Sequence, residues 1–481
     1  AGLDWFLSRN SALAQWSYLP AFRPKGTASL PLQLAEHLIQ DIRAGRLKPG
    51  DALPSSRSLA EALELGRNTV SEAYRELALG GWIQVRPAGG TTVADPLPEG
   101  DHPAPTTPAM PPAPAVRRGD LVVHTGLPDQ RLQPSVLLAR AYRRALQRLE
   151  KDPVHLPDPQ GLPALRVGLA DLLRRSRGMT VDAAQIMVLP SIQFATFLAI
   201  QALVRPGDRI ACEGLCAPAV RQAILRAGGV LVPLPVDADG VDTEALEREL
   251  RAKPIKALFL TPRCQYPTTV ALSTPRREQL KALARRSPFW ILEQDPDGEI
   301  QYGGVPIPSL AAEDAALEVV HIGVLSKVFA GNRRLGYLAV PARLMPELRD
   351  LRRLMDQQGD PALEGALAEL LEDGSLRSHL LRMRETCLER RDALVAALGA
   401  ELEGVLRPTA PGGGMALWVP VDPAVDLEAW HRRAEAQRVA FTPGREFHWD
   451  QQTVPALRLG FAAHEPAELR ELARRLKASL P

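Results

Sequence analysis

Acidic residues crowd one short stretch of the chain, SPFWILEQDPDGEIQYGG at 287–304. An apolar run, Phe289–Leu292, leads directly into the sequence EQDPD at 293–297. In α/β enzymes, catalytic and ligand-binding side chains gather at the carboxyl ends of buried strands. The stretch is therefore a candidate active site, although Gln294 and Pro296 interrupt its acidic row. The alternatives are a changed site and a plain solvated turn.

A lysine follows a second apolar run, in the segment HIGVLSKVFAGNRRLGYLAV at 321–340. Ser326 and Lys327 come directly after this run, and Arg334 follows Lys327 by seven residues. A Ser-Lys pair alone is a weak signal, because most lysines are solvated surface charges. Its place at the end of an apolar run makes Lys327 a second candidate.

A third set of polar residues suits contact with DNA. Arg67, Asn68 and Thr69 stand at the start of a helix predicted over Asn68–Leu79. The first turn of a DNA-reading helix needs hydrogen-bond donors of little bulk to enter the major groove. The candidate contacts to phosphate or the minor groove around it are Arg57, Arg75, Arg86, Gly89 and Gly90.

Three helices and a hairpin, over residues 30–95, must position those DNA-reading residues. The first helix is predicted over Pro31–Ala44, and the second follows the cap candidates Ser55 and Ser56. The second helix ends just before Gly66, which makes the turn into the third. WIQVRPAGGTTVAD then alternates as a two-stranded wing. Residues 1–95 contain ten basic and nine acidic residues, so their net charge gives no support for DNA binding. The order of the elements supports it.

The rest of the chain has the pattern of a large α/β domain. The 481 residues are 45% hydrophobic and 24% charged, with a formal net charge of +2, as in an ordinary globular protein of two or more domains. Apolar strand-like runs alternate with helical patterns, which predicts a mostly parallel sheet with helices on both faces. The four cysteines match neither a zinc spacing nor a disulfide framework, and no apolar run approaches the roughly 20 residues that cross a bilayer. We therefore expect no metal, no membrane partner and a cytoplasmic location.

A proline-rich segment, DPLPEGDHPAPTTPAMPPAPAVRRG, divides the two parts. It is nearly free of large apolar residues and is expected to form a semi-rigid, extended linker. We predict a winged helix-turn-helix domain over 1–94, the linker over 95–119, and a second domain over 120–481.

The N-terminal part closely resembles the winged helix-turn-helix domain of the GntR regulators. The resemblance rests on LPSSRSLA, GRNTVSEAYRELALGG and RPAGGTT, and covers about 65 residues. It implies that the residues singled out above contact a double-stranded DNA operator.

The second part resembles the fold-type I aminotransferases. The segment around Lys327 is similar to the pattern SKxxxxxxRxGY, in which the Lys binds pyridoxal phosphate (PLP) and the Arg, here Arg334, holds its phosphate. DPQGLPALR, TPRCQYP and LRLGFA match further segments of the family in the same order. The resemblance implies that Ser326 and Tyr266 also contact the cofactor. It implies that Arg458 binds a carboxylate of the substrate or effector, as a bidentate guanidinium does; a strand-end ion pair is the alternative.

A winged helix, a proline-rich linker and an aminotransferase-like body in one chain resemble the MocR/GabR subfamily of GntR transcription regulators. The resemblance covers residues 30–481. It implies an α/β protein whose body senses PLP or a small amino compound. It also implies a head-to-tail homodimer.

Four positions depart from the family's pattern at the cofactor. The family's segment WIIEDDYDSEFRY is WILEQDPDGEIQY in this chain. Gln294 therefore replaces the Asp that pairs with the PLP ring nitrogen in the family. Pro296 replaces the Tyr that touches the ring oxygen. Ser191 replaces a Gly of the phosphate-cradling segment, and Ala217 replaces the Tyr that stacks on the ring. PLP acts as an electron sink when a carboxylate keeps its ring nitrogen protonated, and a neutral amide cannot hold that charge.

We therefore predict a DNA-binding transcription regulator of MocR type with an altered PLP site, no catalytic residues and no sustained transamination. The first alternative is a regulator whose body no longer binds PLP and serves dimerisation. The second is a PLP-dependent aminotransferase, which Gln294 and the DNA-reading domain disfavour.

Overall fold

The computed structural model describes residues 29–43, 47–63, 65–86, 90–95, 119–123, 126–151, 158–303, 307–314, 317–325, 327 and 335–481. The chain divides into two compact units, with the boundary between residues 109 and 110. Residues 96–118, nearly all of the predicted linker, lie outside the described residues.

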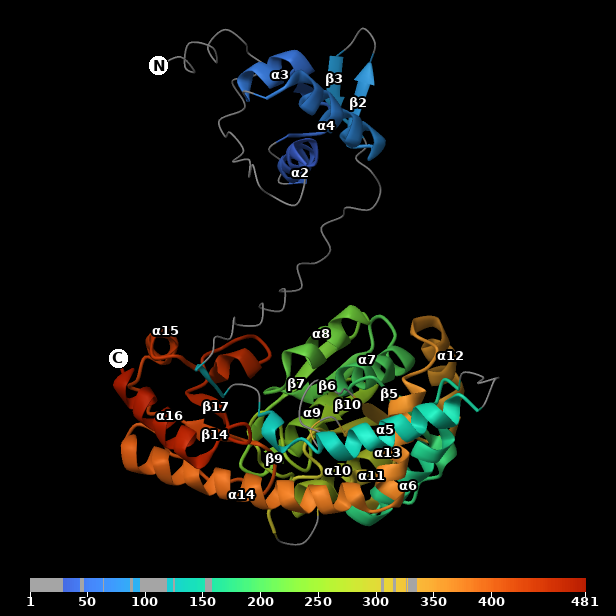
Figure 1. Ribbon diagram of the computed structural model, residues 1–481, viewed down its shortest axis with the longest axis vertical. Coiled ribbons are helices and arrows are strands. Elements are labelled where there is room, and N and C mark those ends of the chain that lie inside the picture. Colours follow the sequence, from blue (N-terminus) through green and yellow to red (C-terminus); the bar gives the residue numbers. More distant parts are fainter. Residues whose placement is uncertain are drawn as a thin grey trace. The chain divides into compact units, whose positions relative to one another are not determined.

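The first unit combines three helices with a small antiparallel sheet of order β1-β3-β2 (Figure 1). Its elements are α2 (Leu30–Arg43), β1 (Ala52–Leu53), α3 (Ser56–Ala62), α4 (Arg67–Leu79), β2 (Ile83–Arg86) and β3 (Gly90–Val93). The sequence predicted two strands in the wing, and β1 adds a third by pairing with β3.

Local signals set the ends of the helices that the sequence predicts to read DNA. Ser55 caps α3, since its hydroxyl accepts a hydrogen bond from the Ser58 amide at 3.1 Å. α3 ends at Ala62, earlier than predicted, because the chain already turns there and the Leu65 amide bonds to the Ala60 carbonyl. One face of α4 is buried in the core of the unit. The first two residues of the helix, Arg67 and Asn68, lie off that face and are exposed.

The second unit is built on a seven-stranded sheet of order β5-β13-β12-β11-β10-β6-β7. β13 runs antiparallel to both of its neighbours, and the other pairs in this sheet are parallel. The strands are β5 (Ile186–Leu189), β6 (Arg209–Glu213), β7 (Val230–Leu234), β10 (Ala257–Leu260), β11 (Trp290–Asp295), β12 (Val319–Val324) and β13 (Gly336–Ala339).

Helices cover both faces of this sheet, as the alternating pattern predicted. Leu292 of β11 belongs to the core under α7, α8 and α12, whereas the adjacent Ile291 belongs to the core on the opposite face. The helices are α5 (Ser135–Leu149), α6 (Pro163–Arg177), α7 (Ile192–Leu203), α8 (Pro218–Arg226), α9 (Thr243–Ala252), α10 (Thr274–Arg286), α11 (Leu310–Glu313), α12 (Met345–Met355) and α13 (Pro361–Glu372).

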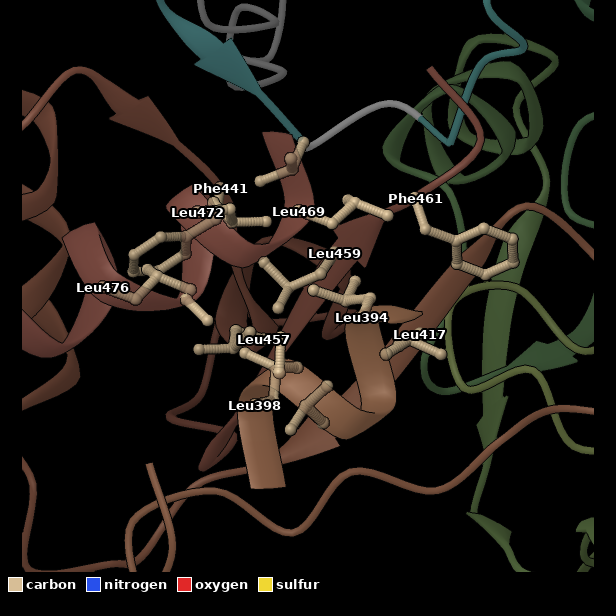
Figure 2. Close-up of a cluster of buried hydrophobic side chains, with 14 of the residues drawn as sticks. Leu394, Leu398, Leu417, Phe441, Leu457, Leu459, Phe461, Leu469, Leu472 and Leu476 are labelled. Carbon is tan, nitrogen blue, oxygen red and sulfur yellow. The ribbon is translucent and has the colours of Figure 1, made fainter. Parts of the chain in front are cut away.

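A long helix, α14 (Ser375–Glu401), joins the sheet part to a C-terminal part (Figure 1). Leu376 and Leu380 pack beside α5, α6 and α13, whereas Leu394 and Leu398 pack in the C-terminal core (Figure 2). That part contains β14 (Ala416–Pro420), α15 (Leu427–Ala436), β16 (Thr442–Pro443), β17 (Ala456–Gly460) and α16 (Pro466–Ala478). Two short pairs complete the unit, β4 (Leu121–Val122) with β15 (Val439–Ala440) and β8 (Val236–Asp237) with β9 (Gly240–Val241).

Two classes of feature are missing from the described residues. None of their helices has both the length and the apolar character needed to cross a bilayer. No group of three or more His, Cys, Asp or Glu side chains among them could hold a metal ion.

Candidate functional site

The acidic stretch lies on and just after a buried strand. β11 continues through the first acidic residues as far as Asp295. Glu293 is 0% exposed, Asp295 3% and Asp297 5%. The alternative of a plain solvated turn is therefore wrong, because buried carboxylates require partners of their own.

Asp295 is the centre of a buried ionic network. One of its oxygens accepts hydrogen bonds from Arg177 Nε at 3.0 Å and from Arg263 Nη1 at 2.7 Å. Arg177 also pairs with Glu299. Burial alone would raise the pKa of Asp295, but the two guanidinium groups outweigh it and hold that pKa well below its usual value. Asp295 is thus committed to the protein's own arginines.

Glu293 is also held by protein groups. It accepts hydrogen bonds from the Ser309 hydroxyl and, at 3.2 Å, from the Leu310 amide. His321 Nδ1 lies 3.5 Å from the carboxylate. Burial opposes ionisation of Glu293, but His321 and Ser309 outweigh it and lower the pKa of Glu293.

Gln294 contacts the N-terminal half of α7. Its side-chain amide donates a hydrogen bond to Thr196 Oγ1 at 2.8 Å, and the Thr196 hydroxyl donates to the Ile192 carbonyl at 2.8 Å. Ser191 caps α7, with its hydroxyl accepting from the Phe194 amide at 3.1 Å. A protein oxygen therefore occupies a helix start of the kind that binds phosphate groups.

The two remaining departures from the family pattern lie close to these elements in the chain. Ala217 is the half-buried N-cap residue of α8 and contributes no capping side chain. Pro296 is half-buried in the turn after β11.

Lys327 pairs with the third acid of the row. Its Nζ lies 2.5 Å from Asp297 Oδ1, and the two side chains are 17% and 4% exposed. Ser326 and Arg334, which the sequence placed beside Lys327 in the cofactor site, lie outside the described residues. The partner of the amine in this structure is thus a carboxylate of the chain itself.

Arg458 and Tyr266 come together from distant segments. The Arg458 guanidinium lies 4.5 Å from the centre of the Tyr266 ring, and Arg458 is 2% exposed on β17. Burial and, to a smaller extent, Asp297 raise the pKa of the Cys264 thiol to about 12, although Lys327 and Arg458 act in the opposite direction. The Lys327–Asp297 pair and Arg458 therefore act on the same buried thiol.

The predicted DNA-reading residues surround an exposed helix start. Arg67 and Asn68 are exposed at the beginning of α4, and Thr69 is half-buried. Within the described residues Arg67 forms no ion pair, whereas Arg57 pairs with Glu61 at 3.3 Å and Arg75 with Glu72 at 2.7 Å. Gly90 is exposed at the start of β3, while Gly89 and the side chain of Arg86 lie outside the described residues.

Comparison with known proteins agrees with both halves of this arrangement. The profile of the bacterial regulatory proteins of the gntR family matches residues 30–93, and that of aminotransferase class I and II matches residues 130–476. Over 465 residues the chain is 31% identical to the probable rhizopine catabolism regulatory protein MocR of Rhizobium meliloti, covering 92% of each chain. The chain belongs to the MocR type of GntR transcription regulators.

A second regulator and a solved aminotransferase are also similar to this MocR-type chain. It is 32% identical over 411 residues to the HTH-type pyridoxine biosynthesis transcriptional regulator PdxR of Corynebacterium glutamicum, covering 85% of this chain and 86% of that one. The solved multiple substrate aminotransferase of Thermococcus profundus matches with a TM-score of 0.70 and 26% identity, over 76% of this chain and 92% of that chain. The predicted fold class and the predicted type of regulator are confirmed.

Sequence reasoning missed the partners of the buried charges in this MocR-type body. Asp297 was part of the quoted acidic row but received no role, although it pairs with Lys327. Arg177 and Arg263 were not singled out, because nothing within their own helix or loop indicates that they meet at Asp295. The only sequence signal for these partners was the row of acids itself, because acids that become buried need cations elsewhere in the fold to balance their charge.

Proposed function

We propose that this regulator reads duplex DNA through the start of α4, and that its aminotransferase-like body acts as a sensing and dimerisation domain that does not sustain transamination. The observation that carries the proposal is the contrast between the two units. The helix start in the first unit presents donors to solvent, whereas the residues around Lys327 in the second are engaged with one another.

Arg67 is the residue best suited to a DNA contact. Its side chain is exposed and forms no ion pair within the described part of the chain, so binding DNA does not require it to leave an acid. Arg57 and Arg75 would each have to exchange a glutamate for a phosphate. These two pairs are exposed, and exposed pairs contribute at most about 1 kcal/mol, so the exchange costs little. Asn68 adds an amide of the kind that reads adenine.

The DNA proposal is tested by substituting Arg67. A duplex is selected from a random pool by the full-length protein, and the Kd of Arg67→Ala is measured at fixed salt. A lost base or phosphate contact typically costs about 1–3 kcal/mol, which raises Kd by roughly 5- to 150-fold. Arg470→Ala, an exposed arginine on α16, is the matched control. An unchanged Kd in Arg67→Ala would show that α4 is not the reading helix.

The residues around Lys327 do not suit PLP as an electron sink. When bound, PLP supplies stabilisation of negative charge on a substrate carbon, and this depends on a carboxylate at its ring nitrogen. The resembled position is Gln294, a neutral amide that already donates to Thr196. Ser191 caps the helix that would receive the phosphate, and Ala217 offers no ring to stack on. Asp297 already balances the charge of Lys327 without a cofactor.

This interpretation is tested by restoring the family's residues. PLP is titrated into the purified protein and followed by near-visible absorbance, with Gln294→Asp/Ala217→Tyr compared with the wild type. A charge-assisted hydrogen bond in place of a neutral one and a stacking face should together add about 1.5–3 kcal/mol, or roughly 10- to 150-fold in affinity. Lys327→Ala in the restored background controls for specific binding and should remove the absorbance band. Tight, stoichiometric PLP binding by the wild type would contradict the proposal.

A small amino compound remains the effector implied by the family resemblance, with Arg458 as its carboxylate partner. The buried guanidinium on the Tyr266 ring supports this role, because a desolvated guanidinium binds a carboxylate strongly. A strand-end ion pair is the alternative role for Arg458. The head-to-tail homodimer is likewise part of the proposal.

A further inference from the structure

A large cavity lies beside the turn that follows β11. Its volume is about 1050 Å³, at the upper end of the range for small-molecule sites. Its walls come from α6, α13 and the first turns of α14 on one side, and from segments 298–303 and 412–413 on the other. Lys327, Gln294, Tyr266 and Arg458 are not among the lining residues. The cavity therefore excludes these four residues, although Arg263 and Glu299 of the buried ionic network do line it.

The lining of this cavity is apolar on one side and polar on the other. Val167 on α6, Leu371 on α13 and Leu381 on α14 belong to the helical walls. The polar side chains Arg384 and Gln301 line the other side, and Arg384 Nη2 donates to the Glu299 carbonyl in the turn after β11 at 3.1 Å. The cavity thus suits a molecule with an apolar body and one polar end.

The hydrogen-bonding groups at the polar end are donors in need of acceptors. Arg384 Nε and Gln301 Nε2 are buried atoms without a hydrogen-bond partner among the described residues. An unsatisfied buried donor is costly, so a turn of either side chain toward an acceptor on a ligand in the cavity would be favoured. A guanidinium favours a carboxylate as that acceptor.

The charges around the cavity favour an acid over an amine. Within the described residues, neither Arg377 nor Arg384 forms an ion pair, and both line the cavity on α14. Two of the lining acids are already paired, Asp171 with Arg174 and Arg175 and Glu299 with Arg177. Glu372 is the lining acid that remains, against two guanidinium groups.

We propose that this cavity binds a small organic acid, with its carboxylate at Arg384 and Gln301 and its apolar body against α6 and α14. The inference goes beyond the proposed function, because it adds a second class of ligand to the small amino compound at Arg458 and places it away from Lys327. Its regulatory meaning rests on the proposed function.

The cavity lies where three parts of the body meet. Gln301 forms a bridge with Gly413, and the Gly414 amide donates to the Ile300 carbonyl at 2.9 Å, which joins the turn after β11 to the C-terminal part. The same turn carries Asp297, the partner of Lys327. A ligand held between this turn and α14 contacts the junction directly. If the ligand binds one arrangement of the junction more tightly than another, it shifts the conformational equilibrium of the body toward that arrangement.

Binding is tested on the full-length protein with radiolabelled octanoate in equilibrium dialysis, without DNA. Octylamine and octanol, which carry the same chain with a cationic or neutral end, compete for the bound label as matched ligands. Arg384→Met keeps the bulk of the side chain and removes its donors, and should raise the Kd for octanoate by about tenfold or more. Arg384→Lys should recover part of the loss because it restores the charge.

A second substitution tests the apolar wall without touching Arg384. Leu381 is 48% exposed, so Leu381→Asp should fold and should abolish octanoate binding by placing a negative charge on the wall. Leu225→Asp, at a residue 46% exposed on α8, is the matched control and should bind as the wild type does.

Several outcomes would overturn the inference. They are the absence of saturable octanoate binding, equal competition by octylamine or octanol, and an unchanged Kd in Arg384→Met. A change in sedimentation of Leu381→Asp without any octanoate binding would instead identify the cavity as a contact between two copies of the chain. The selected DNA duplex is bound and measured separately, so a protein that binds DNA but not octanoate refutes this inference and leaves the proposed function standing.

Discussion

Glu213 is a buried carboxyl whose ionisation should set part of the pH dependence of stability. It lies at the end of β6, is 2% exposed, and accepts hydrogen bonds from the Thr261 amide at 3.1 Å and the Thr261 hydroxyl at 2.8 Å. Burial raises the pKa of Glu213 from 4.5 to about 7, and the hydrogen bonds from Thr261 and Gln265 offset only part of that rise.

The sign of the effect follows from the raised pKa. A carboxyl that holds its proton more tightly in the folded state stabilises the fold fully below its unfolded pKa, near 4.5, and this stabilisation is lost as pH rises through about 7. The difference of about 2.5 pKa units corresponds to about 3 kcal/mol. Glu213→Gln mimics the protonated group at every pH and should therefore remove this loss.

The assay is urea denaturation of both proteins between pH 5 and pH 8, following the transition of the second unit. Relative to Glu213→Gln, the wild type should lose about 3 kcal/mol of unfolding free energy across this range. Glu403→Gln, at an exposed glutamate, is the control and should follow the wild type. Parallel pH profiles for wild type and Glu213→Gln would refute the reasoning, because they would show that Glu213 is ionised in the fold without cost.

Two further predictions concern the buried network and the assembly. Asp295→Asn removes the shared charge partner of Arg177 and Arg263 and should lower the unfolding free energy by about 3–5 kcal/mol. Asp171→Asn, at a partly exposed acid, is the control and should lower it by less than about 1 kcal/mol. Equal losses in urea denaturation would contradict this prediction. The full-length protein should sediment as a dimer, at twice its chain mass of 52.4 kDa. Residues 120–481 alone should also remain dimeric, because the cofactor pocket of the resembled fold lies at a subunit boundary. A monomeric body would argue against the predicted dimer.

Local patterns in the sequence were enough to predict the DNA-reading elements and the α/β body. The predicted third helix began at Asn68 and the observed one begins at Arg67, because Gly66 provides the N-cap that the sequence indicated as a turn. The end of β11 was less predictable, since the polar residues from Glu293 to Asp295 resemble a loop until their partners are known. Those partners are tertiary: Arg177 precedes Asp295 by 118 residues, and Lys327 follows Asp297 by 30. No local pattern encodes such pairs.

The strand geometry of β11 separates its buried acids from Gln294. Successive side chains of a strand point to opposite faces. Glu293 and Asp295 are buried on one face with His321 and the two arginines, and these positions match the family pattern. Gln294, half-buried on the other face, contacts α7 and departs from that pattern.

In the turn after β11, Asp297 is buried and pairs with Lys327, whereas Pro296 is half-buried. Replacing a residue of the buried ionic face would leave guanidinium groups without partners, at a cost of several kcal/mol. Replacing Gln294 on the other face would leave that network intact, because its side chain bonds to Thr196. The ionic network and the position that the family resemblance assigns to the PLP ring nitrogen therefore lie on opposite faces of β11. Under the proposed function, the second can change without disturbing the first.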